Sequence, residues 1–267
     1  MITSASNPKL QLVTSLIRYK KSRDEQNLFV AEGVRLVEDA HHRTILPEFV
    51  LYTQSLSDRG RALVDSLSHH GVPVYDVAET VFKPGVDTEH SQGIVGVFTR
   101  DLMTFPEKPT FLLLVDGVRD PGNMGTLMRS ALAAGVEGVI TTEGTVDVFS
   151  PKVVRAGMGA HFSLPVWQTS WQEVNLRFLP SKTDVAFFVT VVADGAEFWS
   201  QSYQQPCVIV VGGEAEGVSS QALCRADTRI TIPMARNTES LNASTAGTLV
   251  LYEVFRQRTL QPGNHSY

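Results

Sequence analysis

The chain has 267 residues, of which 43% are hydrophobic and 19% are charged, and its formal net charge at pH 7 is −5. This length allows one large domain or two ordinary ones, and the composition excludes a disordered chain. The acidic balance, taken alone, argues against a nucleic-acid partner.

The N-terminal segment has the opposite charge balance. Residues 1–23 contain no Asp or Glu, and their basic residues are Lys9, Arg18, Lys20, Lys21 and Arg23. A solvated basic helix and a phosphate-contacting surface explain this distribution about equally well.

The apolar runs are too short for a membrane span. Residues 184–195 hold about eight apolar residues interrupted by Thr190, whereas a transmembrane helix needs ~20. The N-terminus lacks the long apolar stretch of a secretory signal, so we expect a cytoplasmic protein with no membrane partner. Two cysteines, Cys207 and Cys224, make neither a disulfide framework nor a metal knuckle.

The first half of the chain has an α/β pattern. Its first forty residues are largely helical, with a break near 27–31, and residues 57–71 form a helix that ends at Gly71. Strands are predicted at 48–53, 72–77 and 93–98. Residues 100–110 contain two prolines and no periodicity, which is typical of a linker. We therefore expect one domain over 1–99 and a second over 111–267.

Apolar strands alternate with helices in the second half. Strands are predicted at 111–117, 138–141, 184–193, 207–212 and 229–233, and helices at 123–135, 150–160, 219–226 and 242–259. Asn123 is expected to cap the first of these helices. Strands that are apolar on both faces and alternate with helices indicate an α/β fold with a parallel sheet covered on both sides.

The common catalytic signatures are absent, including H-E-x-x-H, C-x-x-C, G-x-S-x-G and the P-loop. The histidine pairs at 41–42 and 69–70 are adjacent residues that do not share a helix face, so we expect no metal site. A dinucleotide-binding fold would have G-x-G-x-x-G after its first strand, but Gly117, Gly122 and Gly125 are spaced differently. A nicotinamide-dependent dehydrogenase is therefore disfavoured.

Three polar segments follow strands of the second domain: "DGVRDPGNMGTLMRSALAAG" at 116–135, "GGEAEG" at 212–217 and "IPMARNTESLNASTAG" at 232–247. In the first, Arg129 lies roughly 160° around the helix from the face of Leu127, Ala131 and Ala134. A solvated arginine is the simplest interpretation for a helix considered alone. The carboxylates of the second segment would be unfavourable beside a phosphate.

Three stretches in these segments resemble motifs 1, 2 and 3 of the SpoU/TrmH-type SPOUT RNA 2′-O-ribose methyltransferases, in order and in spacing. They are "DPGNMGTLMRSA" at 120–131, "GGEAEGVS" at 212–219 and "IPMARNTESLNASTAGTLVLYE" at 232–253. Residues 6–40 are similar to the substrate-binding domain of the two-domain members, whose fold is like ribosomal protein L30e. The resemblance implies a SPOUT domain with a parallel sheet and a deep trefoil knot, and a smaller L30e-like α/β domain before it. It also implies S-adenosylmethionine as cofactor, an RNA substrate and a homodimer.

The resemblance assigns residues to roles. Gly212, Gly213, Ile232 and Leu241 are expected to bind the cofactor, with glycine allowing close approach of the backbone. The expected catalytic residues are Arg129, Asn123, Glu214, Ser240 and Asn242. A guanidinium rarely deprotonates, so Arg129 is better suited to bind phosphate and stabilise a developing alkoxide than to act as a base.

An RNA surface is expected from Lys152 and Arg155, which share a helix face, and from the N-terminal cluster Lys9, Arg18, Lys20, Lys21 and Arg23. Ribosomal RNA is favoured over transfer RNA because of the L30e-like domain. Transfer RNA and a non-catalytic RNA-binding or ribosome assembly factor with the same fold are the alternatives.

Overall fold

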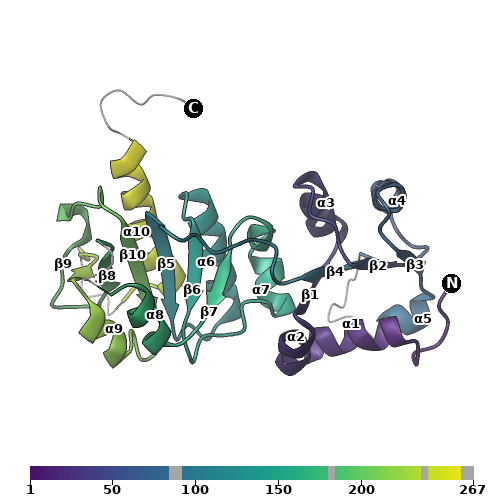
Figure 1. Cartoon of the computed structure of the whole chain (residues 1–267), viewed down its shortest axis with the longest axis horizontal. Coiled ribbons are helices and arrows are strands. Elements are labelled where there is room, and N and C mark those ends of the chain that lie inside the picture. The colour runs from purple at the N-terminus through teal and green to yellow at the C-terminus, as the bar shows by residue number, and fades with distance from the viewer. Residues whose placement is uncertain (84–91, 180–183, 236–239, 260–267) are drawn as a thin grey trace. The chain divides into compact units, whose positions relative to one another are not determined.

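The computed structural model describes residues 1–83, 92–179, 184–235 and 240–259 (Figure 1). It separates into two compact units. The first comprises Met1–Leu102 and Phe149–Phe162, and the second comprises Met103–Val148 and Ser163–Tyr267. Across the described residues, no helix combines the length and the apolar content that a membrane span requires.

The first unit is built on a four-stranded mixed sheet with strand order β1-β4-β2-β3. Strand β4 pairs antiparallel with both β1 and β2, and β3 pairs parallel with β2. The strands are β1 (Leu28–Glu32), β2 (Phe49–Tyr52), β3 (Val74–Asp76) and β4 (Ile94–Thr99). The helices of residues 1–83 are α1 (Pro8–Arg18), α2 (Lys20–Gln26), α3 (Val34–His42), α4 (Asp58–His69) and α5 (Glu79–Phe82).

Two apolar clusters cover the two faces of this sheet. Helix α1 packs Leu10, Val13 and Leu16 against one face. Helices α3 and α4 cover the other, and Figure 1 shows them opposite α1. The predicted strands and the helix at 57–71 are confirmed. The break near 27–31 is more than an interruption of helix, because Asn27 ends α2 in the left-handed region (φ 53°) and β1 follows at once.

Residues 149–162 belong to the first unit, although the domain division by sequence assigned them to 111–267. They contain α7 (Pro151–Ala156) and the 3-10 turn η2 (Ala160–Phe162). The rings of Phe149 and Phe162 lie 5.2 and 6.0 Å from the ring of Phe29 in β1, centroid to centroid. Burial of these aromatic rings holds the segment against β1, which a linker-based division could not detect.

The second unit is a seven-stranded sheet with strand order β7-β6-β5-β10-β8-β11-β9, and every pairing in it is parallel. The strands are β5 (Phe111–Asp116), β6 (Gly138–Thr141), β7 (Val166–Gln168), β8 (Ala186–Thr190), β9 (Ala196–Glu197), β10 (Cys207–Gly212) and β11 (Thr228–Thr231). Strands β5 and β10 are buried at every position, as expected for the centre of a doubly covered sheet.

Helices lie on both faces of this sheet (Figure 1). They are α6 (Pro121–Ala133), α8 (Trp171–Arg177), α9 (Ser220–Arg225) and α10 (Ala243–Thr259), with the 3-10 turn η3 at Phe198–Ser200. Helices α8 and α9 join one buried cluster with alternate residues of β5 and β10. On the other face, a Cβ added to Gly247 of α10 would lie 2.5 Å from the Leu127 side chain and 3.1 Å from that of Val211. Gly247 therefore lets α10 pack closely on α6 and β10. The fold is the α/β class predicted, and the trefoil knot stays a prediction.

The first turn of α6 differs from the expectation. Asp120, not Asn123, is the N-cap, because its side chain accepts a hydrogen bond from the Asn123 N–H at 2.7 Å and Pro121 takes the first helical position. The side chain of Asn123 is thus available for contacts outside the helix.

Asp116, the last residue of β5, ties three loops to the centre of the sheet. Its side chain accepts hydrogen bonds from the Thr142 hydroxyl (2.7 Å), the Trp171 indole N–H (2.9 Å) and the Ser219 backbone N–H (2.7 Å). The residue is 3% exposed. A buried carboxylate costs much free energy unless it is hydrogen-bonded, and this one is fully supplied with donors.

Replacing Asp116 by Asn should destabilise the protein by about 2–3 kcal/mol, since an amide presents an NH₂ group to donors that need an acceptor. Urea denaturation followed by circular dichroism measures this. The matched control is Asp184→Asn at an exposed position, which should change the free energy of unfolding by less than about 0.5 kcal/mol. Equal effects of the two substitutions would contradict the assigned role.

Candidate functional site

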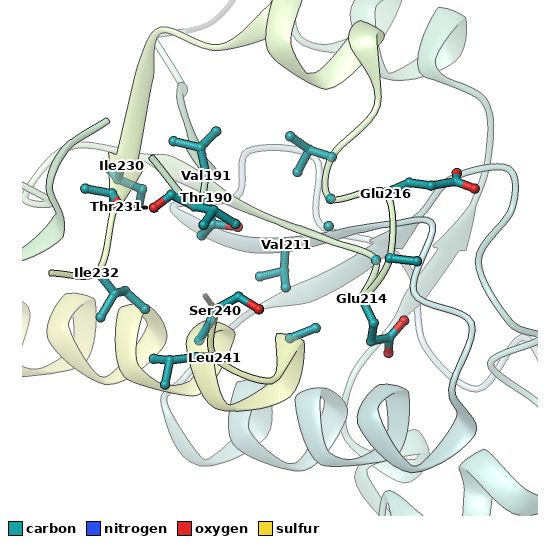
Figure 2. A pocket seen from close by; sticks show the side chains of 18 of the residues that line it. Thr190, Val191, Val211, Glu214, Glu216, Ile230, Thr231, Ile232, Ser240 and Leu241 are labelled. Atoms are coloured by element: carbon teal, nitrogen blue, oxygen red, sulfur yellow. Dashed lines mark hydrogen bonds between the residues drawn. The ribbon is translucent and has the colours of Figure 1, made fainter. Parts of the chain in front are cut away.

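A pocket of the second unit with a volume of about 590 Å³ lies at the carboxyl ends of β8, β10 and β11 (Figure 2). Three chain segments form most of it: Thr190–Val192 after β8, Val211–Val218 at the end of β10, and Ile230–Ile232 with Met234 at the end of β11. Ser240, Leu241 and the first turns of α10 complete the lining. Ligands of parallel α/β sheets bind at this edge, and the volume suits a small cofactor.

The glycine loop after β10 is a tight turn held by its own backbone. Gly213 and Gly217 exchange N–H···O=C hydrogen bonds of 3.0 and 3.1 Å. A Cβ on Gly212 would lie 2.4 Å from the carbonyl carbon of Gly217, and one on Gly213 would lie 2.4 Å from the Gly117 carbonyl oxygen. Glycine is therefore required at both positions so that protein backbones can approach one another. The sequence-based reason, approach of a ligand, does not explain these contacts.

Four polar side chains form a connected cluster beside the glycine loop. The Asn123 amide nitrogen donates to Glu214 Oε1 at 2.6 Å, and the Asn123 amide oxygen accepts from Asn242 Nδ2 at 2.9 Å and from the Ser244 hydroxyl at 3.2 Å. Ser244, which is 6% exposed, also lies 2.7 Å from Asn242 Oδ1. Both ends of the Asn123 amide are thus fixed, and the cluster joins α6, the glycine loop and the start of α10.

A second connection runs from Arg119 to the same loop. The Arg119 guanidinium lies 3.2 Å from a Glu216 carboxylate oxygen, and the Arg119 backbone N–H donates to Glu214 Oε2 at 3.4 Å. The Arg119 and Glu216 side chains are mostly exposed, so the ion pair contributes little to stability. It nevertheless brings the segments after β5 and β10 together at the pocket rim.

The charge of the pocket restricts its ligand. Glu214 and Glu216 are among the described lining residues, and no Lys, Arg or His is among them. A pyrophosphate beside two carboxylates would be repelled, whereas a positively charged ligand would be attracted. The arrangement therefore fits a sulfonium compound better than a dinucleotide.

Most of the residues that the resemblance assigned meet in this region. Gly212, Gly213, Ile232 and Leu241 line the pocket, together with Glu214 and Ser240. Figure 2 shows Ile232, Ser240 and Leu241 on one side and Glu214 on the other. Asn123 and Asn242 join them through the hydrogen bonds to Glu214. Residues 236–239 of the third motif lie outside the described residues.

Arg129 is not part of this arrangement within one chain. It is exposed on α6, as the helical periodicity predicted, and it does not line the pocket. Six residues separate it from Asn123, which corresponds to ~9 Å along the helix axis and about 120° around it. Among the described residues, no hydrogen bond or ion pair of Arg129 is present.

The N-terminal basic cluster is less available than the sequence indicated. Arg23 is 4% exposed and donates to the carbonyl oxygens of Leu16 and Ile17, so its assignment to phosphate binding is wrong. Its guanidinium donates to backbone carbonyl groups in the last turn of α1, which have no partner within the helix. A count of basic residues cannot distinguish this buried role from phosphate binding at the surface. Lys20 and Lys21 pair with acids one turn later, Asp24 at 2.9 Å and Glu25 at 3.6 Å.

The other predicted RNA contacts differ in their surroundings. Lys9 lies over the rings of Phe49 and Tyr75, 4.6 Å from each centroid. Arg18 and Lys152 are exposed, and Arg155 pairs with Glu32 at 3.6 Å. Lys152 is thus well suited to contact phosphate.

Three further contributions were not predicted from sequence: Ser244, Arg119 and the apolar residues Val191 and Val192. The valines lie at the end of the strand predicted at 184–193 and directly after β8, and the rule that parallel strands present ligands at their carboxyl ends would have identified them. Arg119 carried no signal beyond its place beside motif 1.

Gly212→Ala should weaken binding of S-adenosylmethionine by roughly 5-fold to 150-fold, since relief of a 1–3 kcal/mol clash must displace the loop. Isothermal titration calorimetry measures this. Gly217→Ala is the comparison within the same loop: its Cβ would meet nothing within 4 Å, although φ is +67°. Two results would contradict the assignment of this pocket as the cofactor site. One is a Gly212→Ala protein that binds S-adenosylmethionine as tightly as the unchanged protein, and the other is a Gly212→Ala protein that loses less affinity than Gly217→Ala does.

Comparison with known proteins agrees with this geometry. Residues 110–252 match the SpoU rRNA Methylase family, and residues 7–96 match the MRM3-like substrate binding domain. The chain is 31% identical to the 23S rRNA (guanosine(2553)-2'-O)-methyltransferase RlmP of Bacillus subtilis, over 95% of this chain and 98% of that protein. It is 28% identical to the 23S rRNA (uridine(2479)-2'-O)-methyltransferase of Streptomyces viridochromogenes, over 96% and 92%.

A solved structure extends the likeness to the fold of the whole chain. The SpoU methyltransferase AviRb from Streptomyces viridochromogenes, in complex with the cofactor AdoMet, has a TM-score of 0.85 at 27% identity, covering 96% of this chain and 100% of that one. With the family match over its second half and a full-length relative above 30% identity, this chain belongs to the SpoU rRNA methylase family.

Proposed function

We propose that this protein transfers a methyl group from S-adenosylmethionine to a ribose 2′-hydroxyl of ribosomal RNA. The observation that carries the proposal is the cluster of Glu214, Asn123, Asn242 and Ser244 beside an acidic glycine-loop pocket. Membership in the SpoU family supports the reaction, and the names of the two relatives, both 23S rRNA 2′-O-methyltransferases, support the substrate.

The proposal includes a division of labour along the chain. Residues 1–99 bind RNA, residues 100–110 connect, and residues 111–267 carry the reaction, with 149–162 packed on the first unit. The match of residues 7–96 to a substrate-binding domain supports the first assignment. We also propose that the protein works in the cytoplasm and that the second domain contains the trefoil knot.

The pocket residues suit S-adenosylmethionine. Gly212 and Gly213 let the glycine loop pack against the backbone of Gly217 and Gly117. Ile232 and Leu241 offer apolar side chains for an adenine ring. Glu214 supplies negative charge for a sulfonium centre. When bound, the cofactor supplies an electrophilic methyl group.

The hydrogen-bonded cluster would orient the nucleophile. A 2′-hydroxyl is weakly acidic, so its oxygen must be positioned and its developing charge stabilised. The Asn123 amide, fixed at both ends, is a preorganised polar group at the rim, and the Ser240 hydroxyl is a further polar group of the pocket lining. Arg129, a permanent cation, would bind the phosphate next to the target ribose and stabilise the alkoxide.

Because Arg129 lies apart from the pocket of its own chain, we propose that the protein acts as a homodimer through the α6 and α10 surface. These helices are joined by the Ser130–Thr248 hydroxyl pair at 2.7 Å. Leu249 and Tyr252 of α10 are 42% and 45% exposed and offer an apolar surface close to the site.

Arg129→Ala should lower the single-turnover rate of methylation at saturating RNA by about 100-fold or more, as removal of a preorganised charge does in other active sites. Labelled S-adenosylmethionine and ribosomal RNA from cells lacking the gene serve as substrates. Arg229→Ala, which removes the same charge from an exposed position of β11, should retain the rate. An Arg129→Ala protein as active as the Arg229→Ala protein would refute the catalytic role. Absence of transfer by the unchanged protein, with RNA binding retained, would favour a non-catalytic assembly factor.

The mass in solution tests the dimer. If the protein is a dimer, light scattering should give close to twice the chain mass of 29.3 kDa. A dimer that persists at micromolar concentration is expected to bury at least ~1,200 Å² of surface in total. The double substitution Leu249→Glu with Tyr252→Glu should yield monomers. Leu176→Glu, on an exposed apolar residue of α8, should remain dimeric. A monomeric unchanged protein would overturn this part of the proposal.

A further inference from the structure

A second cavity lies wholly within the first unit. It has a volume of about 320 Å³ and is lined by Gly33 and by the side chains of Glu32, Arg35, Leu36, Gln92, Arg155 and Met158. The end of β1, the start of α3 and the α7 segment surround it. The volume is at the lower end for ligand pockets, which suits a single planar ring system better than a dinucleotide.

The polar part of the cavity is a carboxylate and a guanidinium. The Glu32 side chain is 7% exposed, and its Oε2 lies 3.6 Å from Arg155 Nη1. The pair sets a carboxylate and a guanidinium side by side in the wall of the cavity. A carboxylate accepts hydrogen bonds on two oxygens, and a guanidinium only donates, so the wall can recognise donors and acceptors that lie side by side.

Gln92 is held at the edge of the cavity by the start of α3. Its amide oxygen accepts from the Val34 N–H at 2.9 Å. Gly33 has φ +105°, and a Cβ there would lie 3.1 Å from that oxygen, so glycine makes room for the amide. With the oxygen engaged, the NH₂ group is the part of Gln92 that can donate to a ligand.

Apolar and basic groups complete the walls. Leu36 is buried and Met158 is 43% exposed, which provides apolar surface for the faces of a ring. The exposed Arg35 supplies positive charge at the opening. Two arginines, one carboxylate and an amide around an apolar slot resemble a site for a nucleobase with its phosphate more than a site for a lipid or a metal ion.

We propose that this cavity binds a splayed-out guanine of the RNA substrate, other than the nucleotide that receives the methyl group. This inference rests on the proposed RNA function. Guanine presents two neighbouring donors, N1–H and the 2-amino group, which match the two oxygens of Glu32. Its O6 and N7 accept from guanidinium groups such as Arg155. Adenine and cytosine present a ring acceptor beside their amino group, and uracil flanks its N–H with carbonyls, so each would oppose the carboxylate with an acceptor.

Fluorescence anisotropy with the full-length protein tests the base preference. The probes are labelled oligouridine strands with one central guanine, adenine or inosine. The guanine strand should bind about tenfold or more tightly than the adenine strand. Inosine, which lacks the 2-amino group, should fall between them. Glu32→Gln should bring the guanine-to-adenine ratio close to one while leaving affinity for the adenine strand within about twofold.

Two further variants make the result decisive. Glu25→Gln removes an exposed carboxylate of the same unit, 60% exposed in its side chain, and should leave the ratio unchanged. Met158→Asp alters an exposed wall without disturbing the buried pair, and it should weaken binding of the guanine strand by about fivefold or more. If circular dichroism shows that Glu32→Gln fails to fold, binding of the guanine strand by Met158→Asp is the result that tests the proposed guanine site.

A guanine-to-adenine ratio near one in the unchanged protein would overturn the proposal. So would an unchanged ratio in folded Glu32→Gln, or undiminished guanine binding by Met158→Asp. The methylation assay separates this outcome from failure of the enzyme assignment. Methyl transfer without guanine preference would refute only the guanine site. Guanine preference without methyl transfer would refute only the proposed enzymatic function.

Discussion

The buried carboxylate of Asp116 is the interaction on which the geometry of the second unit depends. A parallel sheet places the carboxyl ends of its strands at one edge, but it does not determine the path of the loops that follow them. Asp116 fixes the path of three of these loops, because its carboxylate oxygens accept hydrogen bonds from Thr142, Trp171 and Ser219. Ser219 is the N-cap of α9 and follows the glycine loop. The carboxylate thus holds the far end of the segment that closes the pocket.

The Asn123 amide repeats this arrangement at the pocket rim with a neutral group. An amide can donate and accept at once, so it connects an acid, another amide and a hydroxyl in a defined order. The acid comes from the glycine loop, whereas the second amide and the hydroxyl come from the start of α10. Preorganisation of this kind means that the polar groups need little rearrangement when substrate binds. Asn123 can serve in this way because Asp120 has taken over the capping of α6.

Local patterns in the sequence predicted much of the fold. The apolar runs at 111–117 and 207–212 correspond to the two fully buried central strands, and helical periodicity correctly turned Arg129 toward solvent. Features that depend on long-range contacts were not predictable in this way. Strand β7 has three residues, too few for a pattern, and the buried role of Arg23 depends on carbonyl groups at the end of α1. The same limit applies to Gly212, whose neighbour is a backbone five residues away.

The packing of Phe149 and Phe162 on Phe29 has a consequence for how the chain reaches its native state. The first unit is discontinuous in sequence, since its aromatic core is completed by residues that follow β5, α6 and β6. During synthesis from the N-terminus, β1 must therefore wait for about fifty further residues of nascent chain beyond the linker before its last partners emerge. The sheet of the first unit can therefore form before its packing is complete. Its last contacts depend on α7, a short helix that lies in the second half of the sequence and packs within the first unit.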